Sequence, residues 1–188
     1  QAALVAGAGK VVYFPPGNYK VTTKLSPSAG TDIYGGGATQ SSTNWPTKIT
    51  YQSATGEPLW DIQKPGIKLH DMALVMAPAS AVAGQVGIKV LGGSGKAQDA
   101  DIFNLTVGNF YDGIYIDGTG GVANVFNVHT LNNMRDGIVG GGAQGYWSYL
   151  TSQNNGRHGI YLTSATAPGG VPPWIRTFQT YGNGGCGV

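Results

Sequence analysis

Residues 155–160 read Asn-Gly-Arg-His-Gly-Ile, and variants of this phrase occur four times in the second half of the chain. Each copy has Asn, two variable residues, one polar residue, Gly, and then Ile or Val. The copies occupy residues 109–114, 133–138, 155–160 and 183–188, and a fainter copy without the Asn is Gly87-Ile88. Successive anchoring glycines are 26, 24, 22 and 28 residues apart. A period in the twenties is typical of a solenoid.

The residues after each anchoring Gly predict a short strand with one buried face. The first is always aliphatic and the third is usually aliphatic, as in Ile114 and Ile116, while the residue between them varies. This alternation is typical of a β-strand. Stacked coils would place equal positions about 4.8 Å apart, the spacing of strands in a sheet.

A second strand is predicted before each phrase, because apolar residues again alternate with polar ones. These strands are expected at residues 102–107, 125–130, 147–152 and 175–180. Short strands in coils of this length leave no room for a helix, and no leucine-rich consensus is present. We therefore expect an all-β fold, a right-handed single-stranded parallel β-helix with coils of 22–28 residues.

The Asn that opens each phrase has a structural explanation. Asn accepts left-handed backbone geometry and bonds its own chain at turns, and stacked copies can bond one another from coil to coil. We expect Asn109, Asn133, Asn155 and Asn183 to form such a ladder.

The regular repeat divides the chain into two parts of one domain. Residues 1–58 are expected to form the entry and the first coils, and residues 59–188 the regular coils. Val188 falls inside a predicted strand, so we expect the chain to be part of a longer protein or to have its end covered by a partner, since a solenoid needs a cap.

Composition excludes several classes of protein. Charged residues make up 11% of the chain and the net charge is +2, against a usual charged share of about 25%. This leaves no basic field for nucleic acid. No apolar stretch is long enough to insert into a membrane. A single cysteine, Cys186, excludes an internal disulfide framework. No metal-ligand or cofactor motif stands out, and we expect no metal and no cofactor.

The opening of the chain carries a family resemblance. Residues 12–19 read Val-Tyr-Phe-Pro-Pro-Gly-Asn-Tyr, which resembles the first strand, turn and second strand of the pectate-lyase-like parallel β-helix superfamily. Phage tailspikes, capsule depolymerases and polygalacturonase-type hydrolases belong to that group. In tailspike-type members a helix caps the barrel, and residues 1–4 look like the tail of that helix. The resemblance implies an extracellular or virion protein that acts on a polysaccharide, commonly as a homotrimer.

Polar side chains precede the anchoring glycines on successive coils. Asp112, Asp136 and His158 occupy this position, so the two carboxylates are expected about 5 Å apart. This is close to the separation of about 5–5.5 Å in retaining glycosidases. The order Asp-Gly, Asp, His-Gly-Ile also resembles the polygalacturonase pattern. We therefore take these three residues as candidate catalytic groups. Asp-Gly is equally a common turn pair, and the alternative is that they only turn the chain.

Further side chains near this row are candidate substrate-binding groups. Arg135 and Arg157 can hold sugar carboxylates or, alternatively, neutralise Asp112 and Asp136. Aromatic faces stack on sugar rings, and the outward candidates are Tyr111, Tyr115 and Tyr161, with Trp147, Tyr149 and Trp174 adding to the aromatic surface.

The sequence thus predicts a polysaccharide-binding and polysaccharide-degrading β-helix of a phage tailspike or a secreted depolymerase. A glycoside hydrolase is preferred over a lyase. The alternative is a non-catalytic receptor-binding or adhesive β-helix. The expected partners are a polysaccharide and further copies in a homotrimer or a larger tail or surface assembly.

Overall fold

The structure, a computed structural model, describes residues 8–37, 44–77, 81–92, 99–117, 122–141, 145–163 and 173–188. The described residues form fourteen β-strands. Nine of them form one sheet: β1 (Val11–Phe14), β2 (Gly17–Val21), β3 (Asp32–Gly35), β4 (Thr47–Tyr51), β6 (Lys68–Met76), β8 (Ala100–Gly108), β10 (Ala123–Leu131), β12 (Tyr146–Gln153) and β14 (Trp174–Tyr181). Five form a second sheet: β5 (Trp60–Ile62), β7 (Val86–Leu91), β9 (Asp112–Asp117), β11 (Ile138–Gly141) and β13 (Ile160–Thr163).

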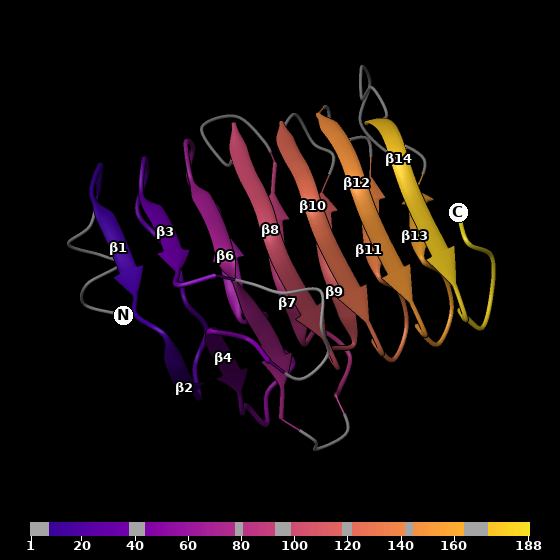
Figure 1. The fold of residues 1–188 in the computed structure, drawn as a ribbon, viewed down its shortest axis with the longest axis horizontal. Helices are drawn as coiled ribbons and strands as arrows, with labels where there is room; N and C mark the ends of the chain where they lie inside the picture. Colours follow the sequence, from indigo (N-terminus) through magenta and orange to yellow (C-terminus); the bar gives the residue numbers. More distant parts are fainter. Residues whose placement is uncertain are drawn as a thin grey trace.

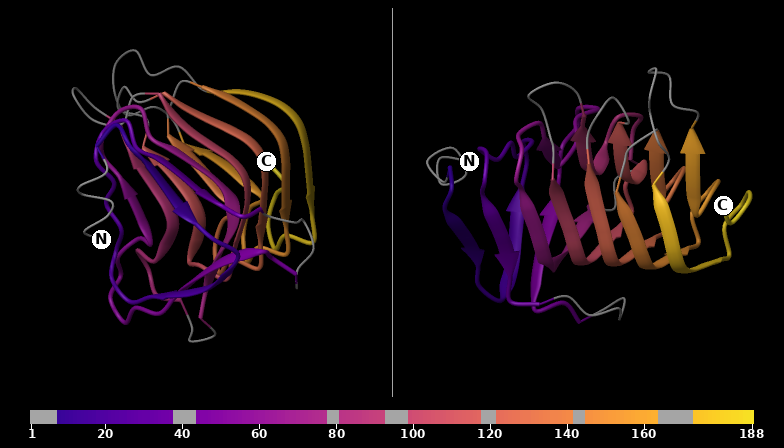
Figure 2. Two further views of the ribbon diagram at one scale, coloured as in Figure 1. Left: turned by 60° about the vertical axis from the view of Figure 1, so that its left-hand side comes forward. Right: turned by 90° about the horizontal axis from the view of Figure 1, so that it is seen from above.

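The chain visits the two sheets alternately, so each pair of strands makes one turn of a coil. From β5 onward every odd-numbered strand joins the five-stranded sheet and every even-numbered strand joins the other. All neighbours within the sheets are parallel, for example β7 with β9 and β10 with β12. Figure 1 shows the coils stacked from β1 at one end to β14 at the other, and Figure 2 shows the two sheets face to face. The predicted right-handed parallel β-helix is confirmed.

The aliphatic residues after the anchoring glycines line the interior. Ile88, Ile114, Ile138 and Ile160 are paired in register across β7, β9, β11 and β13, and all four are fully buried. The exception in the pattern, Gly140, is also explained. A Cβ at Gly140 would overlap the ring of Trp147, which is fully buried. The prediction that Trp147 belongs to an outer aromatic surface is therefore wrong, because its ring fills the space that Gly140 leaves.

The long strands of the nine-stranded sheet bend in the middle. One residue in each of them has a positive φ: Asp71, Asn104, Asn127, Tyr149 and Thr177. Pairing skips this position and resumes after it. The buried residues of β8 are therefore three apart at the bend, as Ile102 and Leu105 are, and not two apart as simple alternation predicts.

The N-terminal entry follows the predicted strand–turn–strand order. β1 pairs with β3 and β2 pairs with β4, with Pro15 and Pro16 between the first two strands. The nine-stranded sheet takes strands from both predicted segments, residues 1–58 and 59–188. The expected cap helix at residues 1–4 lies outside the described residues. Within the described ranges, no helix is long and apolar enough to cross a membrane.

Candidate functional site

The asparagine ladder forms with three of its four predicted members. Asn133 Nδ2 donates to Asn155 Oδ1 at 2.9 Å, and Asn155 Nδ2 donates to Asn183 Oδ1 at the same distance. Asn109 does not join, because the equivalent position in its coil belongs to Phe110, whose N–H donates to Asn133 Oδ1 at 3.1 Å. The cause is a one-residue difference in length between the coils. The end of β8 is paired with a residue 23 positions later (Gly108 with Leu131), whereas the anchoring glycines are 24 apart.

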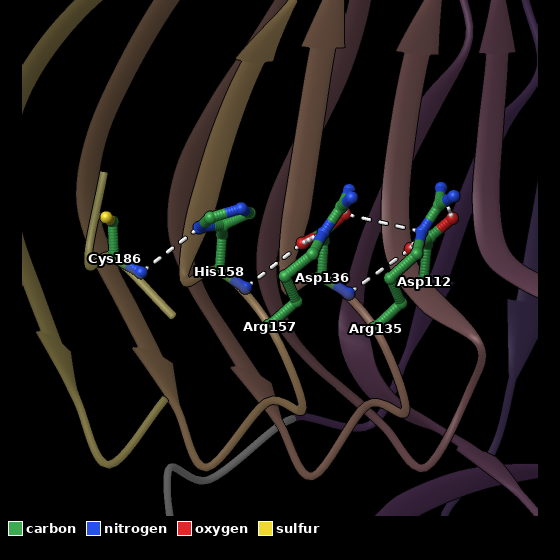
Figure 3. Close-up of polar contacts among 6 residues, drawn as sticks. All are labelled: Asp112, Arg135, Asp136, Arg157, His158 and Cys186. Carbon is green, nitrogen blue, oxygen red and sulfur yellow. Dashed lines mark hydrogen bonds and ion pairs between the residues drawn. The ribbon is translucent and has the colours of Figure 1, made fainter. Parts of the chain in front are cut away.

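The predicted catalytic aspartates form a second ladder, with arginines (Figure 3). Arg135 Nε donates to Asp112 Oδ1 at 2.8 Å and Nη2 donates to Oδ2 at 2.5 Å. Arg157 forms the same bidentate pair with Asp136: Nε donates to Oδ1 at 2.9 Å, and Nη2 donates to Oδ2. These ion pairs are the contacts expected if the two arginines neutralise Asp112 and Asp136.

Backbone groups complete the shell around these carboxylates. The N–H of Asp136 donates to Asp112 Oδ1 at 3.2 Å, and the N–H of His158 donates to Asp136 Oδ1 at 3.0 Å. Asp136 is fully buried and Asp112 nearly so, whereas both arginines are partly exposed. All four carboxylate oxygens already accept hydrogen bonds, an arrangement that favours a structural role for the pair.

The ion pairs also hold the arginines in their charged form. The hydrogen bond to the Asp112 carboxylate raises the pKa of Arg135, against a smaller opposing effect of burial. The bond to Asp136 raises the pKa of Arg157 in the same way. Arg135 Nε also lies 3.3 Å from Asp136 Oδ2. The guanidinium of Arg135 therefore contacts the carboxylates of both Asp112 and Asp136, which lie on neighbouring coils.

Removing one arginine is expected to destabilise the fold. We expect Arg157→Met to lower the free energy of unfolding by about 2–3 kcal/mol, below the 3–5 kcal/mol for a fully buried pair, because Arg157 is partly exposed while Asp136 loses its only guanidinium fork. Arg157→Lys keeps the charge without the fork and is expected to cost about half as much. Urea unfolding measures both. Equal stability of Arg157→Met and the parent would show that the pair adds nothing.

The third predicted catalytic residue, His158, ends the row. Its Nδ1 accepts a hydrogen bond from the N–H of Cys186 at 3.1 Å (Figure 3). Its ring stacks on Tyr161 with the centroids 5.1 Å apart, and the guanidinium of Arg157 lies 4.7 Å from the same tyrosine ring. His158, Arg157 and Tyr161 therefore form one partly exposed cluster.

A groove of about 340 Å³ lies over β7 and β9 on the outer face of the five-stranded sheet. Of the predicted site residues, the structure brings four to its lining: Tyr111, Asp112, Tyr115 and Arg135. The other four do not line it: Asp136, Arg157, His158 and Tyr161. The predicted row is thus divided between a groove at its N-terminal end and a surface cluster at its C-terminal end.

Two charged groove residues, Lys89 and Asp117, had no role in the predicted site. Lys89 is paired in register with Tyr115, and Asp117 follows two residues later on the same face of β9. The strands that carry Lys89 and Tyr115 lie about 4.8 Å apart. The signal was in the sequence, since position two after the anchoring Gly is Lys89, Tyr115, Val139 and Tyr161 in successive coils. Only the first two face the groove.

Comparisons with known proteins find solved structures that share the fold of this chain. No protein-family model matches the chain, and no curated protein matches it. Among solved structures, the mannuronan C-5 epimerase AlgE6 A-module of Azotobacter vinelandii has a TM-score of 0.71 and 21% identity, covering 100% of this chain and 52% of its own. The catalytic unit of a GH87 α-1,3-glucanase from Streptomyces thermodiastaticus has a TM-score of 0.64 and 19% identity. The match covers 89% of this chain and 29% of the glucanase chain.

A viral protein, ORF18 of Geobacillus virus E2, is also similar. Its TM-score is 0.62 at 17% identity, and the match covers 93% of this chain and 34% of the viral one. The chain thus spans about half or less of each of these three structures. At 17–21% identity these likenesses show the fold alone, and that fold is the parallel β-helix that the sequence predicts.

Proposed function

We propose that this chain binds an acidic polysaccharide along the groove over β7 and β9 and cleaves it there. The pairing of Lys89 with Tyr115 in that groove carries the proposal. It places a cation beside a phenol on adjacent coils, on a rigid sheet. The names of two structural neighbours, a mannuronan epimerase and an α-1,3-glucanase, support a polysaccharide as the ligand class.

Each groove residue has a chemical use toward a uronic acid unit. The Lys89 ammonium is a point charge suited to a carboxylate. Tyr111 and Tyr115 offer aromatic surface to a sugar ring, and the guanidinium of Arg135 already lies 5.0 Å from the ring of Tyr111. A solenoid repeats the same positions in a straight line, so a linear polymer would meet these groups unit by unit.

The reaction that best fits this set is elimination. A base takes the proton from the carbon next to the uronate carboxylate, a carbon–carbon double bond forms, and the bond to the leaving glycosidic oxygen breaks. That oxygen leaves with a proton. Tyr115 is the candidate for these proton transfers. Lys89 would stabilise the charge that develops on the carboxylate.

Hydrolysis by Asp112, Asp136 and His158 is the second candidate reaction, after elimination. A general acid must carry a proton that it can give away, whereas both aspartates are bound two-pronged by arginine. These ion pairs also favour the non-catalytic alternative, a receptor-binding or adhesive β-helix that uses the groove only to hold a glycan.

Location and assembly are part of the proposal. The similarity to a protein of Geobacillus virus E2 and the tailspike-like opening support an extracellular or virion protein, of a phage tail or a secreted depolymerase. We expect a homotrimer or attachment to a larger tail or surface assembly. A stable monomer of the full-length gene product in light scattering would contradict this.

One assay separates the three functions. The full-length protein is incubated with polymannuronate, polygalacturonate and a neutral glucan, and three quantities are followed on each polymer: binding, reducing ends and the ultraviolet absorbance of unsaturated uronate. We expect all three signals on an acidic polymer. Reducing ends alone would indicate a hydrolase, and loss of that release in Asp112→Asn or Asp136→Asn would assign it to the aspartates. Binding without release would indicate an adhesive protein. Neither binding nor release on any acidic polymer would overturn the proposal.

A further inference from the structure

The residue at the left-handed position of each bend in the nine-stranded sheet changes in type from the earlier strands to the later ones. At the first three bends the left-handed residue is Asp71, Asn104 or Asn127. Their side chains bond from coil to coil, since Asn104 Nδ2 donates to Asp71 Oδ1 at 3.0 Å and Asn127 Nδ2 donates to Asn104 Oδ1 at 2.9 Å. Asp and Asn accept this geometry more readily than other side chains. The first three bends therefore have residues that suit the fold.

The next two bends break this rule. Tyr149 has φ 55° and Thr177 has φ 48°, and a bulky or β-branched residue at positive φ is a genuine outlier. β12, which carries Tyr149, lies between β10 and β14, so this bend has a neighbouring strand on each side. Strain of this kind is a reason to look for a function at the site.

A groove lies at these two bends. It has a volume of about 260 Å³ and is lined by side chains that include Asn127, Tyr149, Thr151, Thr177 and Gln179. The strands concerned, β10, β12 and β14, lie side by side in the nine-stranded sheet (Figure 1), which is not the sheet that carries the first groove.

The ring of Tyr149 is exposed and held in place. It is 56% exposed, and it packs edge-on against Phe126 with the centroids 5.1 Å apart and the planes at 69°. The remaining lining residues are Leu150, whose side chain is buried, and Phe178, and none of the seven lining residues is charged. A nucleic acid or an acidic peptide would therefore find no opposite charge here.

We propose that this second groove binds a neutral sugar unit of a glycan. An exposed aromatic face offers stacking to the apolar side of a sugar ring, and amide and hydroxyl groups offer hydrogen bonds to its hydroxyls. The volume is below the range of about 300–1,000 Å³ for drug-sized ligands, which suits one sugar unit and not a long segment. This site is independent of the function proposed for the groove over β7 and β9.

The decisive variant is Tyr149→Asn, because it should move stability and binding in opposite directions. Asn suits the left-handed bend and extends the amide ladder beyond Asn127, so the melting temperature should rise. Binding of neutral gluco-, manno- or galacto-oligosaccharides, measured by titration calorimetry on the full-length protein, should weaken at least fivefold, within the effect of one aromatic contact. Tyr149→Gly also relieves the strain and should lose binding equally.

One control variant isolates the site. Tyr146→Ala removes an exposed ring of the same strand that lies outside the groove. It should keep neutral-sugar binding. Unchanged sugar binding in Tyr149→Asn, a lower melting temperature of that variant, or no neutral-sugar binding by the parent would each overturn the proposal. A changed oligomeric state without a change in sugar binding would also overturn it, in favour of a contact between copies.

Discussion

Alanine at Gly137 is expected to destabilise the protein by more than about 3 kcal/mol, the upper end of the usual cost of overpacking a core. A Cβ at this position would overlap Ser152 Oγ and lie 2.5 Å from both the carbonyl oxygen of Gly159 and Thr130 Oγ1. One of these is backbone of the next coil, so the overlap cannot be relieved by turning a side chain. The measurement is the urea midpoint, compared with the parent at equal slope.

Gly9→Ala is the matched control for this substitution. Its Cβ would meet no atom within 4 Å, although its φ is 64°. Its cost should therefore be limited to the left-handed backbone, about 1–2 kcal/mol. If Gly137→Ala unfolds no earlier than Gly9→Ala, close approach between the coils does not explain the repeated glycine.

The same contact explains three further anchoring glycines, Gly87, Gly113 and Gly159. A Cβ at Gly87 would lie 2.6 Å from the carbonyl oxygen of Gly113, and a Cβ at Gly113 would lie 2.5 Å from that of Gly137. Gly159 stands in the same relation to Gly187, at 2.8 Å. None of these glycines has a positive φ. They are required by distance between coils and not by backbone conformation.

Removal of a single oxygen at Tyr115 should abolish most of the activity. If Tyr115 transfers the protons of an elimination, Tyr115→Phe is expected to lower kcat by about 10²–10⁴-fold, the usual contribution of a general acid or base. The ring that stacks on the sugar is retained, so KM should change little. The measurement is the initial rate of unsaturated product on the best acidic polymer.

Tyr161→Phe is the control for this prediction. Tyr161 has the same repeat position as Tyr115, two coils further on, and does not line the groove. We expect its kcat to stay within about twofold of the parent, since no proton transfer is assigned to it. Full activity of Tyr115→Phe would exclude this tyrosine from the chemistry. Equal losses in both variants would point to a general effect on the sheet.

Much of the site could be placed from the repeat, but its division could not. Equal positions in successive coils lie side by side, so the neighbourhood of Asp112, Arg135 and Asp136 followed from spacing alone. Whether each carboxylate faced a ligand or an arginine depended on the course of the backbone just before the anchoring Gly. The structure turns both aspartates into the ion-paired row, and the loops near Gly56 and Gly84 complete the groove on the first coils only.

The sequence by itself determined the architecture, because a period of 22–28 residues with alternating aliphatic residues can bury one face only by stacking coil on coil. It determined the interior ladder of Ile114, Ile138 and Ile160 for the same reason. Tertiary structure decided what depends on offsets of one residue. Asn109 leaves the asparagine ladder because its coil is shorter before the Gly, and Tyr149 takes a left-handed bend that simple alternation does not reveal. Local pattern sets which faces are apolar, whereas contacts between coils depend on register, and register becomes fixed only when the coils stack.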